Sequence, residues 1–319
     1  MGDILRVEGL KKYFDTPRGT LHAVDDISVS IAQGETLGVV GESGCGKSTF
    51  GRVVLHLLES TGGKIIYKGE DVTKVNRKEL KRLRGEMQII FQDPFSSLDP
   101  RMSVSTIIEE PLKNEGMPKE ERKAKVKELM ATVGLAERLA DSYPHELDGG
   151  RRQRIGIARA IALNPDFIVC DEPVSALDVS IQAQVINLLL DLQKERNLTY
   201  MFISHDLSVV KYLSHNIMVM YLGQTVELSE TEELFAHPLH PYTQALLSAV
   251  PIPKYGEKKQ RILLKGEITS PINPKPGCRF AARCLYAKPE CFSEQPPLVE
   301  VRPKHKVACH KVAEELGKK

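Results

Sequence analysis

The chain has 319 residues, enough for one large domain with a smaller appendage. Its composition, 41% hydrophobic and 27% charged, is that of a globular protein and excludes a wholly disordered chain. A formal net charge of +2 argues against nucleic acid as a partner. No apolar run reaches the roughly 20 residues of a membrane-spanning helix, and the N-terminus lacks the apolar segment of a signal peptide. We therefore expect a soluble, cytosolic chain.

Short apolar stretches rich in β-forming residues alternate with helical patterns along the first part of the chain. These stretches span residues 36–40, 87–91, 167–170 and 200–203. An amphipathic helical pattern covers residues 182–196. This alternation predicts an α/β fold with a doubly wound parallel sheet. Between them, residues 102–143 have a mostly helical pattern and predict a helical insertion.

The composition changes after about Leu234. Nine of the 19 prolines lie beyond Ala249, and that stretch carries 15 Lys and Arg against seven Asp and Glu. We therefore predict a first domain at residues 1–235 and a small, irregular module at residues 236–319.

A phosphate-loop motif of the form GxxxxGK[ST] spans residues 41–48. It follows an expected strand and precedes an expected helix at residues 49–58, which is the context that supports such a motif over a chance match. The glycines let backbone N–H groups face phosphates, Lys47 reaches the terminal phosphates, and Ser48 can bind Mg²⁺. The expected nucleotide-binding residues of this loop are Gly41, Glu42, Ser43, Gly44, Cys45, Gly46, Lys47, Ser48 and Thr49.

Two adjacent carboxylates, Asp171 and Glu172, end the apolar stretch that begins at Phe167. The alternative without a functional role is an acidic pair that only starts a turn at Pro173. Beside a phosphate loop, a functional role is favoured. Asp171 would hold Mg²⁺ through water, and Glu172 would be the base that polarises the attacking water.

Together these motifs resemble the ATP-binding subunit of an ABC transporter over about residues 4–235. The resemblance implies a P-loop NTPase core with an antiparallel β edge near the N-terminus and a helical subdomain at about residues 93–160. It also implies roles for four weaker signals. Tyr13 would stack on adenine, Gln92 would be the catalytic and Mg²⁺-binding glutamine of the Q-loop, Asp178 would close the D-loop, and His205 would be the switch histidine. Taken singly, such a histidine is more often structural and such a tyrosine is usually surface.

In the family that this chain resembles, the signature loop of a second copy covers the γ-phosphate. Here residues 147–154 depart from the family pattern LSGGQ at two positions. Gly149 and Gly150 are present, but an ionised Asp148 has only hydrogen-bond acceptors and would repel the phosphate. We therefore expect a second, non-identical ABC ATPase chain as the partner, with a symmetric homodimer as the alternative.

Residues 237–247, HPLHPYTQALL, and the tail that follows resemble the C-terminal extension of ATPases from oligopeptide and dipeptide importers, over about residues 236–312. The resemblance implies ATP-driven peptide import by a peripheral subunit at the cytoplasmic face of the cell membrane. Two transmembrane permease subunits and, indirectly, an extracytoplasmic solute-binding protein would be its partners. The alternatives are import of nickel or oligosaccharides, an exporter ATPase, and a non-transport ABC ATPase acting on DNA or ribosomes.

Four cysteines cluster in the tail, which we expect to be too polar to fold around a core of its own. A reducing cytosol argues against disulfides, and the clustering argues against four unrelated free thiols, so a metal is favoured. The spacing lacks the short CxxC of most structural zinc sites, and the similar importer tails favour a [4Fe–4S] cluster, with Zn²⁺ as the alternative. Because the cysteines lie far beyond the last ATPase motif, we expect them to take no part in hydrolysis. The expected ligands are Cys278, Cys284, Cys291 and Cys309.

Overall fold

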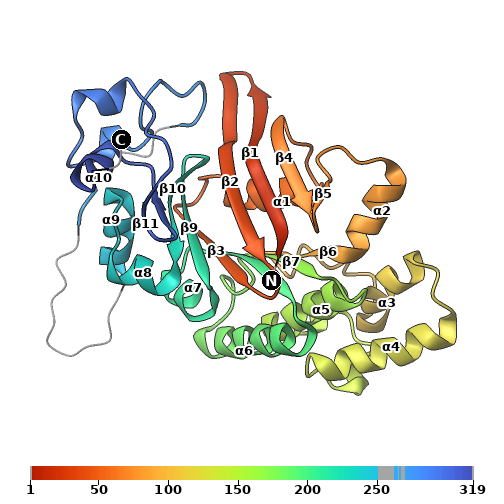
Figure 1. The fold of residues 1–319 in the computed structure, drawn as a ribbon. Coiled ribbons are helices and arrows are strands. Elements are labelled where there is room, and N and C mark those ends of the chain that lie inside the picture. The colour runs from red at the N-terminus through yellow and green to blue at the C-terminus, as the bar shows by residue number, and fades with distance from the viewer. Residues whose placement is uncertain (1, 251–261, 265, 267–269, 318–319) are drawn as a thin grey trace, which may run out of the picture. The chain divides into compact units, whose positions relative to one another are not determined.

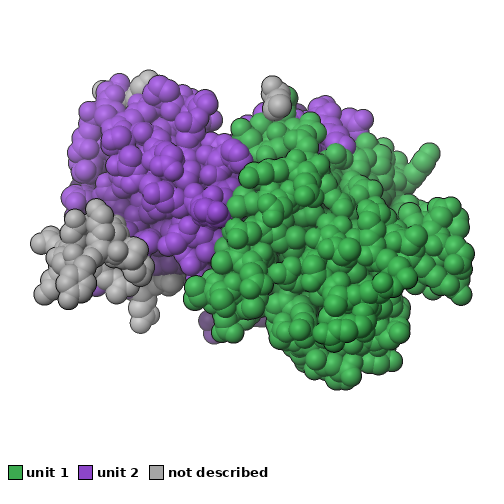
Figure 2. All heavy atoms as spheres, turned by 90° about the horizontal axis from the view of Figure 1, so that it is seen from below, with its two compact units in different colours: residues 1–2, 32–35, 74–203 green, residues 3–31, 36–73, 204–319 purple. Residues whose placement is uncertain are grey.

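The computed structural model describes residues 2–250, 262–264, 266 and 270–317. The remaining residues of the predicted C-terminal module lie outside the described part. The chain divides into two compact units, which Figure 2 distinguishes by colour. Unit 1 comprises residues 1–2, 32–35 and 74–203, and unit 2 comprises residues 3–31, 36–73 and 204–319.

An antiparallel sheet forms the N-terminal part of unit 2, with the strand order β2-β1-β4-β5 (Figure 1). Its strands are β1 (Asp3–Thr16), β2 (Gly19–Ala32), β4 (Gly62–Tyr67) and β5 (Glu70–Asp71). Ile27, Val29 and Ile31 of β2 are buried while the residues between them are exposed, the period-two pattern of a sheet with one face on the core. The sheet agrees with the antiparallel β edge that the resemblance implies.

A second set of strands in unit 2 contains the strand that leads into the phosphate loop. Strand β3 (Thr36–Val40) pairs in parallel with β9 (Asn216–Tyr221), and β9 pairs in an antiparallel manner with β10 (Gln224–Glu230). Two strands of the C-terminal tail, β12 (His305–Val307) and β11 (Val299–Arg302), continue the order beyond β10. The tail therefore extends the sheet and covers an edge that would otherwise be unpaired.

The helices of unit 2 are short. They are α1 (Lys47–Val54), α7 (Leu207–Leu213), α8 (Thr231–Ala236), α9 (Pro241–Ala249) and α10 (His310–Glu315). The helix expected at residues 49–58 starts earlier and ends earlier, at Val54. His56 has a φ of +54°, a left-handed conformation that does not continue a helix.

Unit 1 contains three parallel strands in the order β8-β7-β6: β6 (Met87–Ile90), β7 (Phe167–Asp171) and β8 (Thr199–Ile203). Every residue of β7 and β8 is buried. Strands covered on both faces have continuous apolar runs, as these do. The parallel pairing confirms the α/β prediction.

The other regular elements of unit 1 are mainly helices, and α3, α4 and α5 pack against one another (Figure 1). The helices are α2 (Arg77–Glu86), α3 (Val104–Asn114), α4 (Lys119–Thr132), α5 (Gly149–Ile161) and α6 (Val179–Arg196). Helix α3 buries Val104, Ile107, Ile108 and Leu112, the spacing of one helical face. The structure thus contains the helical insertion that the pattern of residues 102–143 predicts.

The expectation that the tail is too polar for a core of its own is wrong. Val301, Val307 and Val312 form a buried cluster that also includes partly buried apolar side chains. The three valines come from β11, β12 and α10, and these three elements bring their side chains into one cluster. The tail is therefore stabilised in part by its own packing.

Candidate active site

The phosphate loop follows β3 in unit 2, and two of its glycines have no room for a side chain. Gly46 has a φ of +102°, and a Cβ there would lie 2.0 Å from the carbonyl oxygen of Ala23. A Cβ on Gly41 would lie 2.2 Å from the carbonyl oxygen of Met220. Both the backbone conformation and the close approach of neighbouring chain require glycine at these positions.

Lys47 lies within the curve of this loop. The residue is 4% exposed, and Nζ donates to the carbonyl oxygens of Gly41 at 2.8 Å and Glu42 at 3.1 Å. Helix α1 begins at Lys47 after Gly46, and no side chain caps it. The positive end of the helix and the Lys47 ammonium therefore share one loop, the arrangement that binds phosphate groups.

Tyr13, the expected adenine-stacking residue, is also in unit 2. Its ring stacks on His22 with centroids 4.0 Å apart, and its hydroxyl donates to Asp25 at 2.5 Å. Arg279 of the C-terminal tail makes an ion pair with the same carboxylate. Burial alone raises the pKa of Asp25, but the bond from Tyr13 and the charge of Arg279 outweigh burial and hold this pKa below its ordinary value.

The expected catalytic acids lie in unit 1 at the end of β7. Asp171 is 1% exposed, whereas Glu172 has a φ of +46°, which is uncommon for a residue with a side chain. The backbone N–H of Glu172 donates to the carbonyl of Ile203 at 2.9 Å, which holds this conformation. The amide Nε2 of Gln92 donates to Glu172 Oε2 at 3.0 Å. The structure thus brings Gln92 and Glu172 together.

The segment that follows Glu172 is stabilised by a residue that sequence reasoning missed. Gln182 donates from Nε2 to the carbonyl oxygens of Val174 at 3.0 Å and Leu177 at 2.9 Å. These bonds hold the segment expected to be the D-loop, and Asp178 occupies the position before the first residue of α6. Gln182 lies in the predicted amphipathic helix, where nothing in the pattern distinguishes it from an ordinary solvated residue.

The signature region lies at the start of α5 in unit 1. Asp148 Oδ1 accepts from the backbone N–H of Arg151 at 2.8 Å and so caps the helix, and its Oδ2 lies 3.4 Å from Arg151 Nε. A Cβ on Gly150 would lie 2.6 Å from Ile181, so α5 approaches α6 closely there. The Asp148 carboxylate is therefore already engaged by a cation and a helix N-terminus within its own loop.

His205 lies between β8 and α7 in unit 2 and is exposed. Its neighbours fix the turn, because Asp206 caps α7 by accepting from Ser208 N–H at 2.8 Å, and Ser204 Oγ accepts from Asp206 N–H at 3.0 Å. His205 shares its unit with the phosphate loop, whereas Gln92 and the acidic pair belong to unit 1.

Two arginines of the tail, both missed by sequence reasoning, make contacts within unit 2 at or beside expected ATP-site residues. Arg283 donates to both carboxylate oxygens of Glu42, at 2.6 and 3.0 Å. Arg279 contacts Asp25 as described above. The tail cysteines are expected to take no part in hydrolysis, and this stays a prediction. Arg283, which lies between two of them in the sequence, nevertheless contacts Glu42 of the phosphate loop. One basic residue in a basic tail has no local signal that would reveal its partner.

The HPLHPYTQALL segment is anchored by a buried carboxylate. Glu227 of β10 accepts from the backbone N–H groups of Leu239 and His240 at 2.8 and 2.9 Å, and from His305 Nε2 at 2.7 Å. His240 Nδ1 in turn accepts from the backbone N–H of Tyr242 at 3.1 Å and caps α9. Burial lowers the pKa of His240 to about 4. This segment is thus tied to both β10 and the tail strand β12.

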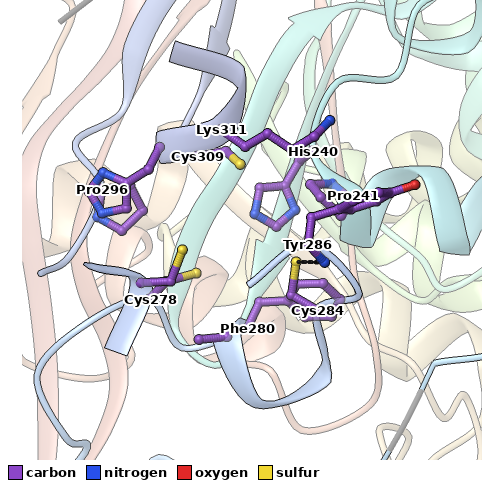
Figure 3. A pocket seen from close by; sticks show the side chains of 12 residues that line it. His240, Pro241, Cys278, Phe280, Cys284, Tyr286, Pro296, Cys309 and Lys311 are labelled. Carbon is purple, nitrogen blue, oxygen red and sulfur yellow. Dashed lines mark hydrogen bonds between the residues drawn. The ribbon is translucent and has the colours of Figure 1, made fainter. Parts of the chain in front are cut away.

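The four tail cysteines line one pocket of about 20 Å³, and Figure 3 shows Cys278, Cys284 and Cys309 there beside His240. The backbone N–H of Cys278 donates to the carbonyl of Cys291 at 2.8 Å. Burial, reinforced by the neighbouring cysteines, raises the pKa of Cys278 to about 11.

All six cysteines of the chain are free thiols. Within the described residues, no group of three or more His, Cys, Asp or Glu side chains is arranged to hold a metal ion. The structure therefore gathers the expected ligands at one pocket without forming a coordination geometry.

A parallel sheet whose strand leads through a glycine-rich loop into a helix, with a buried lysine in that loop, defines a P-loop nucleotide-binding protein. Comparisons with known proteins identify the family within this class. Residues 24–175 match the ABC transporter family, and residues 226–291 match the C-terminal region of oligopeptide/dipeptide transporters.

The chain is 54% identical to the oligopeptide transport ATP-binding protein AppF of Bacillus subtilis (strain 168), over 96% of this chain and 97% of that protein. It is 52% identical to the putative oligopeptide transport ATP-binding protein YkfD of the same organism, over 96% and 95% of the two chains. The dimeric, post-hydrolysis structure of the ATP-binding cassette MJ0796 with ADP and Pi matches with a TM-score of 0.66 and 27% identity, over 71% of this chain and 98% of that one. The chain therefore belongs to the ABC transporter family of ATP-binding proteins and is an ATP hydrolase.

Proposed function

We propose that this protein hydrolyses ATP to power the import of oligopeptides or dipeptides through an ABC transporter. The observation that carries the proposal is the joining of a phosphate loop to an oligopeptide-type C-terminal region in one chain. The relatives AppF and YkfD are named as oligopeptide transport ATP-binding proteins, and they match this chain over nearly its whole length.

The residues of the motifs are assigned separate parts of the reaction. Lys47 and the loop N–H groups bind the phosphates. Ser48 and Gln92 would hold Mg²⁺ directly and Asp171 would hold it through water, and the ion would supply positive charge against the phosphates. Glu172 accepts a proton from the attacking water. Its hydrogen bond from the Gln92 amide supports this role, because that bond orients the carboxylate without protonating it.

Two further residues complete the proposed ATP site. Tyr13 stacks on adenine, and its orientation is supported by its hydrogen bond to Asp25 and its stacking on His22. His205 contacts the γ-phosphate as the switch residue.

The proposed partners are two transmembrane permease subunits and a second, non-identical ATPase chain, with a solute-binding protein acting indirectly. In the described part of the chain, no helix is long and apolar enough to span a bilayer. In this proposal the permeases supply the membrane attachment, at the cytoplasmic face. Asp148 supports the unequal pairing, because a carboxylate cannot donate the hydrogen bond that the family's serine donates.

The four-cysteine pocket is proposed to hold a [4Fe–4S] cluster, with Zn²⁺ as the alternative. The donor set fits, since four thiols that line one pocket are ligands for either. Such a group would link four points of the tail covalently.

The direct test is to assemble the chain with its membrane subunits and binding protein in vesicles and measure ATP hydrolysis with different solutes. We expect dipeptides or oligopeptides to stimulate hydrolysis, and we expect Glu172→Gln to abolish the stimulation. Stimulation by nickel or an oligosaccharide alone would replace the peptide assignment. Copurification with ribosomes in place of permeases would replace the transport assignment.

A further inference from the structure

Arg279 and Arg283 lie between Cys278 and Cys284 in the sequence, and both belong to unit 2. Arg283 contacts Glu42 of the phosphate loop directly, and Arg279 contacts Asp25, the hydrogen-bond partner of Tyr13. Their side chains are only 6% and 9% exposed. Burying two guanidinium groups is costly unless each is paired, so these contacts are specific features of the fold and differ from ordinary surface ion pairs.

Glu42, the second residue of the phosphate loop, is fixed at three points. Arg283 grips its carboxylate with two parallel bonds, at 2.6 and 3.0 Å. Its backbone N–H donates to the Tyr242 hydroxyl at 2.8 Å, and its carbonyl accepts from Lys47 at 3.1 Å. A planar, bidentate guanidinium restricts the orientation of its partner as well as its position. The tail therefore restrains the same loop residue that Lys47 contacts.

Arg279 contacts the residues that surround Tyr13. It makes an ion pair with Asp25 and donates to the carbonyl of Leu222. Asp25 accepts the hydroxyl of Tyr13 at 2.5 Å. The ring proposed to stack on adenine is thus oriented by a carboxylate that the tail holds in place.

A single short segment supplies both guanidinium groups. Arg283 ends a short 3₁₀ turn at Ala281–Arg283, and Phe280, which precedes the turn, is 1% exposed. The Phe280 ring packs against Tyr221 and Tyr242 with centroids 5.2 and 5.4 Å away. Because Phe280 is anchored in this way, the two arginines cannot move independently of the segment.

We propose that Arg279 and Arg283 are positioning residues of the ATP site, through which the C-terminal extension sets the affinity for ATP. Arg283 orients the phosphate loop through Glu42, and Arg279 orients Tyr13 through Asp25. This inference rests on the proposed function, since it assumes that the loop and Tyr13 bind ATP. The competing view is that the arginines only anchor the tail.

The test is the dissociation constant of Mg·ATP, measured by calorimetry on the full chain, together with KM and kcat of the assembled transporter. We expect Arg283→Gln to raise the dissociation constant and KM about tenfold, the effect of losing a bond to a charged group. We expect kcat at saturating ATP to change by less than about twofold, because the interaction is made equally before and during the reaction. Arg283→Lys keeps the positive charge but cannot make two parallel bonds to Glu42. Its dissociation constant should lie between those of the wild-type chain and Arg283→Gln.

A matched control separates positioning from anchoring. Arg302 also makes a tail ion pair, with Glu233 at 2.8 Å, but neither residue belongs to the ATP site. Arg302→Gln should lower thermal stability without changing the dissociation constant. Glu42→Gln should weaken ATP binding as Arg283→Gln does, and the double variant should be no weaker than either single variant, since both remove one interaction.

Native ATP affinity in both Arg283→Gln and Arg283→Lys would overturn the inference and leave the proposed function standing. So would equal losses in the Arg283 and Arg302 variants. A wild-type chain that bound no ATP would overturn the proposed function together with this inference.

Discussion

The Gln92 amide donates to the Glu172 carboxylate across 3.0 Å, and the two residues are 80 positions apart in the sequence. Glu172 also has an uncommon positive φ of +46°. A residue in a strained backbone conformation, with its side chain held by a neighbour, is typical of a preorganised catalytic group.

Lys47→Ala and Glu172→Gln should have different defects. Removal of the Lys47 ammonium should weaken ATP binding roughly a hundredfold, because it removes charge-assisted bonds worth about 1.5–3 kcal/mol each. Glu172→Gln should bind ATP with near-native affinity and lose hydrolysis by about 10²–10⁴, the usual contribution of a general base. Binding by calorimetry and phosphate release from the assembled transporter measure the two effects. Native turnover by Glu172→Gln would disprove the assignment of the base.

Asp148→Ser should strengthen the partner's nucleotide site. Serine keeps a cap for α5 and gains a hydrogen-bond donor, while the carboxylate charge is removed. Regaining a bond to a charged acceptor is worth roughly 1.5–3 kcal/mol. The measurement is ATP-driven dimer closure, for instance by crosslinking or light scattering with the hydrolysis-deficient Glu172→Gln background.

Asp148→Ala is the control, because it removes the charge but supplies neither cap nor donor. If closure is unchanged in Asp148→Ser, the pair of Asp148 with Arg151 already compensates for the missing serine.

His240 should make the fold acid-sensitive. Its pKa is lowered from 6.5 to about 4 by burial, so below pH 6.5 the unfolded chain binds a proton that the folded chain does not. This contribution to stability is complete above pH 6.5 and is lost as the pH falls towards 4, by about 3 kcal/mol in total. Urea unfolding at several pH values measures the loss.

His240→Asn is the matched variant for that experiment, since its side-chain oxygen can still accept the Tyr242 N–H that His240 Nδ1 accepts. We expect a smaller decline in stability between pH 6.5 and 4 for this variant. An identical decline in both proteins would show that His240 is not the titrating group.

Anaerobic purification tests the content of the four-cysteine pocket. The proposed cluster predicts a brown protein with about four irons per chain. Cys309→Ser should lower the iron content and the melting temperature of the tail, whereas Cys45→Ser, whose thiol is not in the pocket, should leave the iron unchanged. One zinc per chain in a colourless protein would exclude the cluster but keep a metal link, and neither metal would exclude both.

The class of the fold and the nucleotide motif could be read from local patterns. Apolar stretches such as 167–170 predicted buried parallel strands because strand burial leaves a continuous apolar run in the sequence. The phosphate loop was identified because its glycines and Lys47 are adjacent along the chain. The helix predicted at residues 49–58 extends too far, because the apolar pattern continues past Val54 whereas the backbone turns at His56.

The sequence by itself determined the α/β class, the phosphate loop and the presence of a distinct tail, because each depends on residues that are neighbours in the chain. Only the tertiary structure decided that the tail extends the sheet beyond β10, has a small core of its own, and places Arg283 against Glu42. Those features are pairings between residues distant in sequence. A single arginine carries no record of its partner, because the partner is selected by the path of the whole backbone and by the requirement that a buried charge be neutralised.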